Sequence, residues 1–260
     1  MSDYLKNLFG LDGRTAAVIG GTGVLGGAIA EALASAGAHV LVVGRNADNG
    51  NACVERITAA GGTAEFVAAD STKREDLEGI ISHAAGSGKT IDVLVNGAGV
   101  NSATPFLEIE DDEWNRILDI NLRSVRLACQ VFGKHMLEAQ NKGSIINIAS
   151  LSGMTALSRV FTYSASKAAV INLTQNLARE WAAKGVRVNA LSPGFFPAEQ
   201  NRKVLTPDRV ASIMGHTPAD RFGEPQELAG AVIMLAAASA GSFVTGANIV
   251  VDGGFSCMTI

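Results

Sequence analysis

Short, continuous apolar runs alternate with longer helical patterns along the whole chain, and this alternation constrains the fold more than any other feature. The runs lack the apolar–polar alternation of half-exposed strands, so they predict strands buried on both faces. We expect strands at residues 14–20, 39–43, 64–68, 91–95, 144–149, 186–191 and 248–251. We expect helices at residues 24–36, 46–60, 73–85, 113–136, 163–183 and 225–238. The pattern predicts an α/β fold, a doubly wound parallel sheet of Rossmann type in a single domain.

The composition agrees with one well-packed domain. The chain has 260 residues, 47% hydrophobic and 18% charged, which supplies a sizeable core and argues against disorder. No linker or short repeat divides it, so we expect residues 1–260 to form one domain. Its least regular part, at about 193–218, is a candidate substrate lid. The net charge of −4 gives no attraction to nucleic acid or to an anionic membrane.

Several features predict a cytoplasmic protein without a metal site. The first ten residues contain no apolar stretch of signal-peptide length. Residues 228–251 carry no charge, but serines, glycines and other polar residues interrupt them, which favours a buried helix and strand over a membrane span. The three cysteines are scattered, as expected of free thiols in a reducing compartment. The four histidines show no metal-ligand spacing, so we expect no catalytic metal.

A glycine cluster, Gly20-Gly-Thr-Gly-Val-Leu-Gly-Gly27, lies between the first expected strand and the first expected helix. Glycines at this point allow a tight turn and let the backbone approach a pyrophosphate at the helix N-terminus. A purely steric turn is the alternative, but the place of the cluster after strand one favours dinucleotide binding. The candidate cofactor contacts are Gly20, Thr22, Gly23, Val24 and Leu25.

The end of the second strand, Val43-Gly44-Arg45-Asn46, bears on which dinucleotide binds. An acidic residue there would accept hydrogen bonds from the ribose 2′-hydroxyl of NAD. Gly44 offers no carboxylate, whereas Arg45 offers a guanidinium suited to a 2′-phosphate. The alternative is a surface arginine at a turn. The sequence therefore favours NADP(H) over NAD(H), with Arg45 and Asn46 as candidate contacts.

Polar and small residues also follow the third and fourth strands, where ligands bind in this architecture. Asp70 either accepts from the adenine amino group or caps the helix that begins near Lys73. The candidate cofactor residues at these strand ends are Asp70, Ser71, Asn96, Gly97 and Ala98.

A tyrosine and a lysine four residues apart suggest acid–base chemistry. On a helix, Tyr163 and Lys167 share one face. A nearby ammonium lowers the pKa of a phenol, and the hydroxyl of Ser150 is placed to hold a substrate oxygen. An ordinary half-exposed helix face is the alternative. Asn121 lies within an apolar helix, where it either bonds a backbone carbonyl and holds a water or is a satisfied structural amide.

Taken in order, Asn96-Gly-Ala-Gly99, Asn121, Ser150, Tyr163-x-x-x-Lys167 and Pro193-Gly194 resemble the motifs of the short-chain dehydrogenase/reductase family. The resemblance covers essentially the whole chain. It implies Tyr163 as the catalytic acid/base and Lys167 as both its pKa modulator and a ribose ligand. It also implies a homotetramer. It further implies that Ser150 holds the substrate oxygen and that Asn121 anchors a relay water. Pro193, Gly194 and Phe196 would flank the nicotinamide.

The chain departs from the family pattern at two positions and resembles one branch in particular. Val24 stands where a glycine is usual, and Ala198 where a threonine often bonds the carboxamide. The glycine cluster and the segment after Pro193 are similar to those of mannonate (fructuronate) oxidoreductases and gluconate 5-dehydrogenase-like enzymes. That similarity implies a keto-sugar acid as the substrate, with Ser150, Ser152, Tyr163 and Arg202 as candidate contacts. The alternatives are a 3-oxoacyl thioester or another ketone, and a cofactor-binding sensor without turnover.

Overall fold

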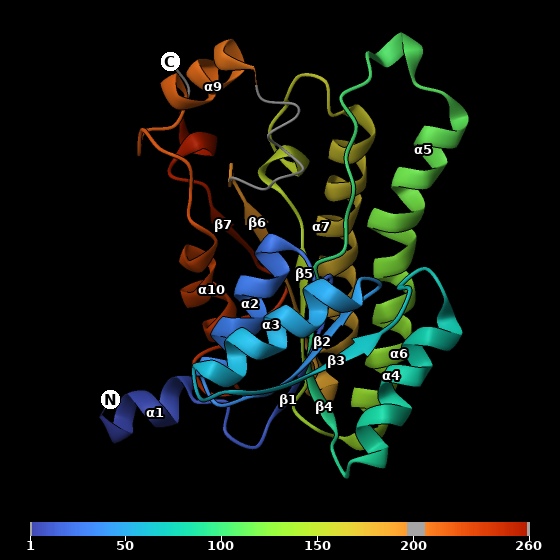
Figure 1. Ribbon diagram of the computed structural model, residues 1–260, viewed down its shortest axis with the longest axis vertical. Helices are drawn as coiled ribbons and strands as arrows, with labels where there is room; N and C mark the ends of the chain where they lie inside the picture. The colour runs from blue at the N-terminus through green and yellow to red at the C-terminus, as the bar shows by residue number, and fades with distance from the viewer. Residues whose placement is uncertain (1, 197–205, 259–260) are drawn as a thin grey trace.

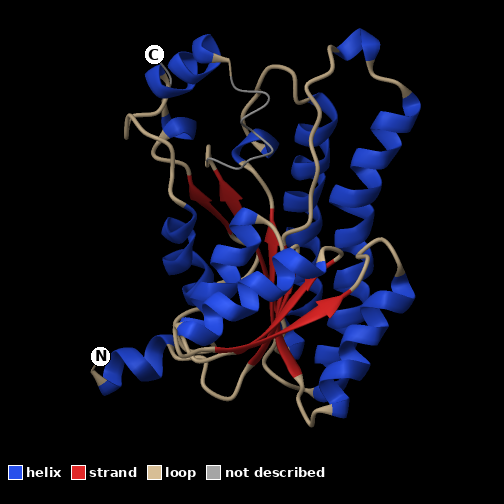
Figure 2. Ribbon diagram, viewed as in Figure 1, coloured by secondary structure: helices blue, strands red, loops and turns tan. Residues whose placement is uncertain are grey.

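Seven parallel strands form one sheet in the computed structural model, which describes residues 2–196 and 206–258 (Figures 1 and 2). The strand order is β3-β2-β1-β4-β5-β6-β7. The chain therefore leaves β1 for one side of the sheet and returns beside β1 for the other, so the turns after β1 and β4 diverge and leave room for a ligand. The strands are β1 (Thr15–Ile19), β2 (His39–Gly44), β3 (Thr63–Ala68), β4 (Ile91–Asn96), β5 (Ser144–Ile148), β6 (Arg187–Pro193) and β7 (Asn248–Val251).

Helices cover both faces of the sheet and create two cores. Residues of β1 alternate between them: Ala16 and Val18 pack in one core, Ala17 and Ile19 in the other. This alternation explains why the central strands are continuously apolar. The first core is closed by α2 (Val24–Ser35), α3 (Ala47–Ala59) and α10 (Ala229–Ala236). The second is closed by α4 (Arg74–Gly86), α6 (Ser124–Ala139) and α7 (Phe161–Trp181).

The predicted α/β sheet is confirmed, with differences at its edges. All seven strands form at the expected places, but β3 and β7 are only half-buried. Both are edge strands, so one side of each has no neighbouring strand and the two-sided burial of the central strands is incomplete.

The expected helix at residues 113–136 is interrupted. It is formed by α5 (Asp111–Leu118), a π-helical turn (Asp119–Arg123) and α6. The turn contains Asn121, whose side chain bonds backbone outside the helix. Such turns widen a helix locally and occur often at functional sites.

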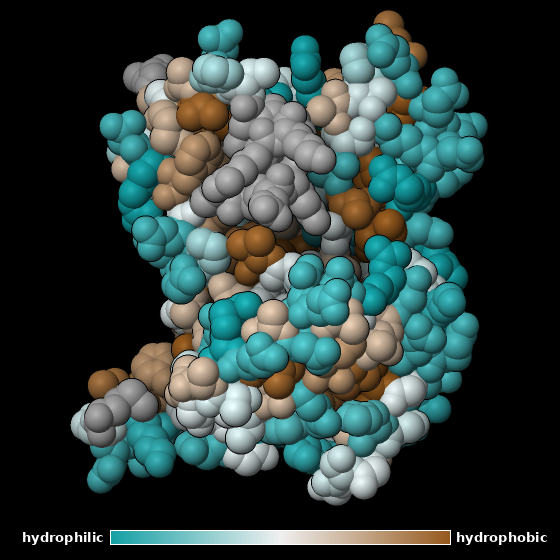
Figure 3. All heavy atoms as spheres, viewed as in Figure 1, coloured by the Kyte–Doolittle hydropathy of each residue, from teal (hydrophilic) through white to brown (hydrophobic). Residues whose placement is uncertain are grey.

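The helix expected at 225–238 is shorter than predicted, and two helices were not predicted at all. A 3₁₀ turn (Pro225–Leu228) precedes α10, which ends at Ala236. The unpredicted helices are α1 (Asp3–Phe9) and α9 (Pro207–Gly215). Helix α1 projects from the body with no buried residue, and apolar surface is exposed on it (Figures 1 and 3).

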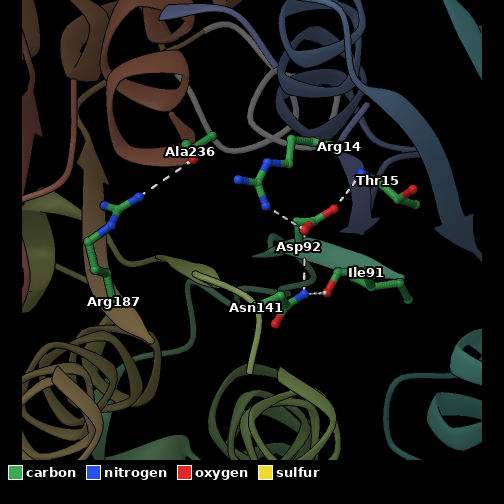
Figure 4. A network of polar contacts seen from close by, with 7 residues as sticks. All are labelled: Arg14, Thr15, Ile91, Asp92, Asn141, Arg187 and Ala236. Carbon is green, nitrogen blue, oxygen red and sulfur yellow. Dashed lines mark hydrogen bonds and ion pairs between the residues drawn. The ribbon is translucent and has the colours of Figure 1, made fainter. Parts of the chain in front are cut away.

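A polar network joins the start of the chain to the amino ends of the strands (Figure 4). Asp92 of β4 accepts from Arg14 Nη1 at 2.7 Å and from the backbone N–H of Thr15 at 3.0 Å. Asn141, just before β5, donates to the carbonyl of Ile91 at 3.2 Å. Asp92 is only 8% exposed, so its bonds to Arg14 and Thr15 hold the start of β1 against β4 from within the protein.

Arg187 is a second buried charge at this end of the sheet, and it has no carboxylate partner among the described residues. Its Nη2 donates to the carbonyls of Ala236 and Ala237 at 3.5 and 3.3 Å, at the C-terminus of α10 (Figure 4). The negative end of a helix dipole stabilises a cation there. Burial lowers the pKa of Arg187 from its usual value.

We expect Asp92→Ala to lower the free energy of unfolding by about 1.5–3 kcal/mol, because it leaves the buried N–H of Thr15 and the Arg14 guanidinium without their acceptor. Chemical denaturation followed by circular dichroism measures the change. Glu138→Ala is the control, since its pair with Lys134 is exposed and 3.8 Å long and contributes about 0–1 kcal/mol. Equal losses in the two variants would contradict this role of Asp92.

Candidate active site

The candidate catalytic residues meet where β5 ends and α7 begins. Ser150 lies two residues after β5, and Tyr163 and Lys167 occupy successive turns of α7. The hydroxyl of Ser150 lies near enough to the phenol of Tyr163 to lower the pKa of that phenol. Lys167 Nζ lies 5.5 Å from the centroid of the Tyr163 ring. The structure thus brings together the two hydroxyls and the amine that the sequence singled out.

The Lys167 amine is held by the strand rather than by the phenol. Its Nζ donates to the carbonyl of Ile148, the last residue of β5, at 2.8 Å, and the side chain is 3% exposed. Burial lowers the pKa of Lys167 to about 8, because removal from water disfavours its charged form. At neutral pH the amine is still mostly protonated, with less margin than a surface lysine has.

The expected lowering of the phenol pKa is not observed. Burial raises the pKa of Tyr163 above its usual value, and the hydrogen bond from Ser150 only partly offsets this. The physical reason is that desolvation penalises a phenolate more than the neighbouring groups stabilise it in this state of the protein. Tyr163 is therefore protonated at neutral pH.

Ser152 lies next to Ser150, as expected of a substrate contact. Its backbone N–H and its hydroxyl donate to Ser150 Oγ at 3.2 and 3.1 Å. Ser150 caps a 3₁₀ turn (Leu151–Gly153), so its side chain is positioned by the turn that follows it.

Asn121 is fully satisfied by the protein. Its Oδ1 accepts from the N–H of Val100 at 2.8 Å, and its Nδ2 donates to the carbonyl of Val100 at 2.9 Å and to Ser166 Oγ at 3.1 Å. Ser166 in turn donates to the carbonyl of Tyr163 at 2.6 Å. The amide side chain therefore ties the loop after β4 to the first turn of α7, which is a positioning contact for Tyr163.

A chain of buried polar side chains runs behind the site, and the sequence analysis did not single out two of its members. Asn96 Nδ2 donates to Asn147 Oδ1 at 2.8 Å, and Asn147 Nδ2 donates to Thr174 Oγ1 at 2.9 Å. The signal for Asn147 is an amide within the apolar strand β5. Asn96 was predicted as a cofactor contact, but its side chain is buried between β4 and α6.

The glycine cluster forms a cradle that side chains would fill. A Cβ on Gly20, whose φ is +81°, would lie 2.7 Å from the backbone nitrogen of Ala98, and a Cβ on Gly26 would collide with the carbonyl of Gly20. Helix α2 begins after Gly23, which provides no side-chain cap, so the first N–H groups of the helix have no side-chain acceptor. These features fit a pyrophosphate, although Val24 replaces a usual glycine.

The end of β2 lies beside this cradle. A Cβ on Gly44 would lie 2.6 Å from the Thr22 side chain, so a carboxylate at position 44 requires Thr22 to move. Asn46 caps α3, since its side chain accepts from the N–H of Asn49 at 2.9 Å. The guanidinium of Arg45 is exposed and acts on Asp70 electrostatically.

Asp70 does not cap α4. The N-cap of α4 is Lys73, so the prediction that Asp70 caps this helix is wrong. Instead, Asp70 Oδ1 accepts from the N–H and hydroxyl of Thr72 at 3.0 and 2.8 Å. The Thr72 N–H is the largest of the effects that hold the pKa of Asp70 below its usual value, and Arg45 adds to them. Ser71 lies beside it, half-buried, at the same edge.

The segment after β6 is described only in part. A Cβ on Gly194 would lie 2.6 Å from Asp252, so glycine is required for this close approach. The side chain of Phe196 is 5% exposed and packs in the core with α2 and α10. Arg202 and Ala198 lie outside the described residues, as does the middle of the expected lid.

Within residues 2–196 and 206–258, no cluster of three or more histidine, cysteine or acidic side chains is suited to a metal ion. None of the helices in the same part of the chain is long and apolar enough to cross a bilayer.

Comparisons with known proteins agree with this arrangement. A family model described as enoyl-(acyl carrier protein) reductase matches residues 22–256. The uncharacterized oxidoreductase UxuB of Bacillus subtilis is 39% identical, over 94% of this chain and 95% of its own length. The 2-dehydro-3-deoxy-D-gluconate 5-dehydrogenase of Escherichia coli is 36% identical, over 96% of this chain and 98% of its own.

A solved structure of similar sequence shows the same fold. The gluconate 5-dehydrogenase from Burkholderia cenocepacia, in complex with NADP and tartrate, superposes with a TM-score of 0.92. The two proteins are 33% identical, and the match covers 98% of this chain and 100% of that one. The chain therefore belongs to the short-chain dehydrogenase/reductase family, whose members are NAD(P)-dependent oxidoreductases acting on alcohol and keto groups.

Proposed function

We propose that the protein interconverts a keto-sugar acid and the corresponding secondary alcohol with NADP(H). The observation that carries this proposal is the convergence of the Ser150 hydroxyl and the Tyr163 phenol, with the buried amine of Lys167 5.5 Å from the centroid of the Tyr163 ring. This arrangement holds one oxygen between two hydroxyls, as transfer of a proton to or from a carbonyl oxygen requires. The glycine cradle lies at the neighbouring strand ends.

The protein's own groups supply the proton chemistry. The nicotinamide coenzyme, when bound, gives or accepts the hydride. Ser150 holds the substrate oxygen, and Tyr163 protonates it during reduction or accepts its proton during oxidation. Lys167 binds the ribose and maintains a positive charge near the phenol, and Asn121 positions Tyr163 through Ser166. Because the pKa of Tyr163 lies above its usual value, the phenol carries at neutral pH the proton that reduction of a carbonyl consumes.

Glycine and arginine at the end of β2 support NADP(H) over NAD(H). At position 44, a carboxylate that would bond a free 2′-hydroxyl requires the Thr22 side chain to move. The exposed guanidinium of Arg45 is suited to a 2′-phosphate. The remaining cofactor contacts in this proposal are Gly20, Thr22, Gly23, Val24, Leu25, Asn46, Asp70, Ser71, Asn96, Gly97, Ala98, Tyr163, Lys167, Pro193, Gly194 and Phe196.

The relatives support a sugar acid as the substrate class. The Escherichia coli relative is named for 2-dehydro-3-deoxy-D-gluconate and the Burkholderia cenocepacia structure for gluconate. The candidate substrate contacts are Ser150, Ser152, Tyr163 and Arg202. A 3-oxoacyl thioester is the second candidate, because a relative that is 36% identical over 94% of this chain is named 3-oxoacyl-[acyl-carrier-protein] reductase. A screen of keto-sugar acids, neutral ketoses and 3-oxoacyl thioesters with NADPH and NADH distinguishes the two.

We also propose a cytoplasmic homotetramer. Its location is supported by three free cysteines, two of them buried, as in a reducing compartment. Its assembly is supported by large apolar side chains left exposed on the isolated chain, among them Phe106, Leu107, Phe161 and Phe243. Sedimentation equilibrium should give about four times the mass of one chain. A mass of one or two chains at micromolar concentration would contradict the tetramer.

Replacing Tyr163 tests the chemistry directly. We expect Tyr163→Phe to lower kcat by about 10²–10⁴-fold, because it removes the proton donor and leaves the ring in place. The affinity for NADPH, measured by fluorescence titration, should change little. Tyr4→Phe is a matched control, since Tyr4 is the chain's other tyrosine and lies exposed on α1. Turnover retained by Tyr163→Phe would rule out the assigned role.

Replacing Arg45 tests the coenzyme preference. We expect Arg45→Asp to shift the ratio of kcat/KM for NADPH and NADH at least about tenfold toward NADH, because it replaces a charge-assisted contact to the 2′-phosphate with repulsion. Lys142→Asp reverses an exposed charge before β5, at the other end of the strands, and should leave the ratio unchanged. An unchanged ratio in Arg45→Asp would show that this position does not contact the 2′-phosphate.

A further inference from the structure

A cavity of about 380 Å³ lies between the segment that follows Ser150 and the inner side of α9. One wall is residues 155–158, which the chain traverses between Ser150 and Tyr163. The opposite wall is α9, which lies beyond the carboxyl ends of β6 and β7 (Figure 1). Phe195, which directly follows Gly194, completes it. Its volume is within the range of roughly 300–1,000 Å³ that small-molecule sites occupy.

The cavity has the lining of a site for a polyhydroxylated molecule. Phe195, Ile213 and Phe255 offer apolar surface, and Phe255 is fixed by ring contacts of 5.2 Å to Phe195 and 4.6 Å to His216. Hydroxyl groups of Thr155, Ser158 and Ser212 also line it. Such a mixture suits the C–H groups and hydroxyls of a sugar chain.

The charged and titratable side chains of the described lining are basic. Arg209 lies on the α9 wall together with His216, and none of the described lining residues is acidic. This contrasts with the chain as a whole, which has a net charge of −4. A cavity with basic groups and no carboxylate favours an anionic ligand.

The guanidinium of Arg209 is oriented but not neutralised. Its Nη2 donates to the carbonyl of Ser158 at 3.1 Å and its Nη1 to Ser158 Oγ at 3.5 Å. A guanidinium has five N–H groups, so three remain for another acceptor. In the part of the chain that the structure describes, no carboxylate pairs with it. Ser158 therefore orients the Arg209 guanidinium, and because both of its acceptors are neutral, they do not compensate the positive charge of the guanidinium.

We propose that Arg209 binds the carboxylate of the keto-sugar acid and is the residue by which the protein selects an acid over a neutral sugar. This inference rests on the proposed function, since it assumes a sugar chain whose carbonyl lies at Tyr163. The planar guanidinium matches a carboxylate with two parallel hydrogen bonds. The far end of the substrate then lies between α9 and residues 155–158, and its reacting oxygen lies at Ser150.

The test compares two ligand pairs that differ only at the carboxylate. 5-Keto-D-gluconate and L-sorbose form the pair of ketones, and D-gluconate and D-glucitol form the pair of alcohols. Kinetics with NADPH give kcat and KM for the ketones. Calorimetry on the full chain saturated with NADPH gives Kd for the alcohols, and because the reduced coenzyme cannot oxidise an alcohol, this readout does not depend on turnover.

We expect Arg209→Gln to raise KM for 5-keto-D-gluconate and Kd for D-gluconate at least about tenfold, because it removes a charge-assisted contact. The rate kcat should stay within a few-fold, since the reacting groups are untouched, and the values for L-sorbose and D-glucitol should change less than twofold. Arg209→Lys, which keeps the charge but loses the planar fork, should lie between Arg209→Gln and the unmodified protein.

Arg159→Gln is the matched control. It removes the same charge from the residue after Ser158, which is exposed and does not line the cavity. We expect all four values to remain within twofold of those of the unmodified protein. An effect of Arg159→Gln equal to that of Arg209→Gln would overturn the proposal, because it would reflect the net charge near the entrance rather than a contact.

Three further outcomes separate the inference from the proposed function. If the unmodified protein prefers the acids and Arg209→Gln does not change that preference, only the role of Arg209 is wrong. If Arg209→Gln weakens acid and neutral ligands equally, Arg209 has a structural role through Ser158, and the inference is again wrong. If the unmodified protein neither reduces nor binds the sugar acids but reduces a 3-oxoacyl thioester, the proposed function fails and this inference fails with it.

Discussion

The hydrogen bond from Lys167 Nζ to the carbonyl of Ile148 is the contact on which the geometry of the site depends. It joins the last residue of β5 to the second turn of α7, and so it sets the distance between Ser150, which follows the strand, and Tyr163, which precedes the lysine by one turn. The amine is almost completely buried, so moving it would leave a cation or a carbonyl without a partner in a poorly solvated place. The Tyr163 and Lys167 spacing, which is a weak signal in the sequence alone, is thereby fixed relative to Ser150 in the folded protein.

The sheet supplies the rest of the arrangement. Because all seven strands are parallel, their carboxyl ends share one edge, and the reversal of strand order beside β1 opens that edge between β1 and β4. The glycine cradle, the Asn121 contact and the Ser150 turn all lie on loops at this edge. The buried chain from Asn96 through Asn147 to Thr174 joins β4 and β5 to α7, so hydrogen bonds between buried side chains specify how α7 sits on the sheet.

Most of the sheet and the catalytic constellation could be predicted because both depend on local pattern. Central strands are read from apolar runs, and Tyr163 and Lys167 need only a helix to share a face. The π-helical turn at Asn121 could not be predicted from the sequence, because it depends on a contact with the backbone of Val100, 21 residues away. The raised pKa of Tyr163 could not be read either, because desolvation is a property of the packed site.

The same reasoning explains why Arg209 was not recognised while Arg202 was named. Both arginines follow Pro193-Gly194, and their sequence surroundings do not distinguish them. Helix α9 is short, with Thr206 as its cap and Pro207 at its start, and these signals place the helix but not its packing partner. Only the contact between α9 and Ser158, 51 residues earlier, turns Arg209 toward the cavity. The position of Arg209 therefore depends on how a late helix packs on an earlier loop, whereas the shared face of Tyr163 and Lys167 depends only on their spacing along one helix.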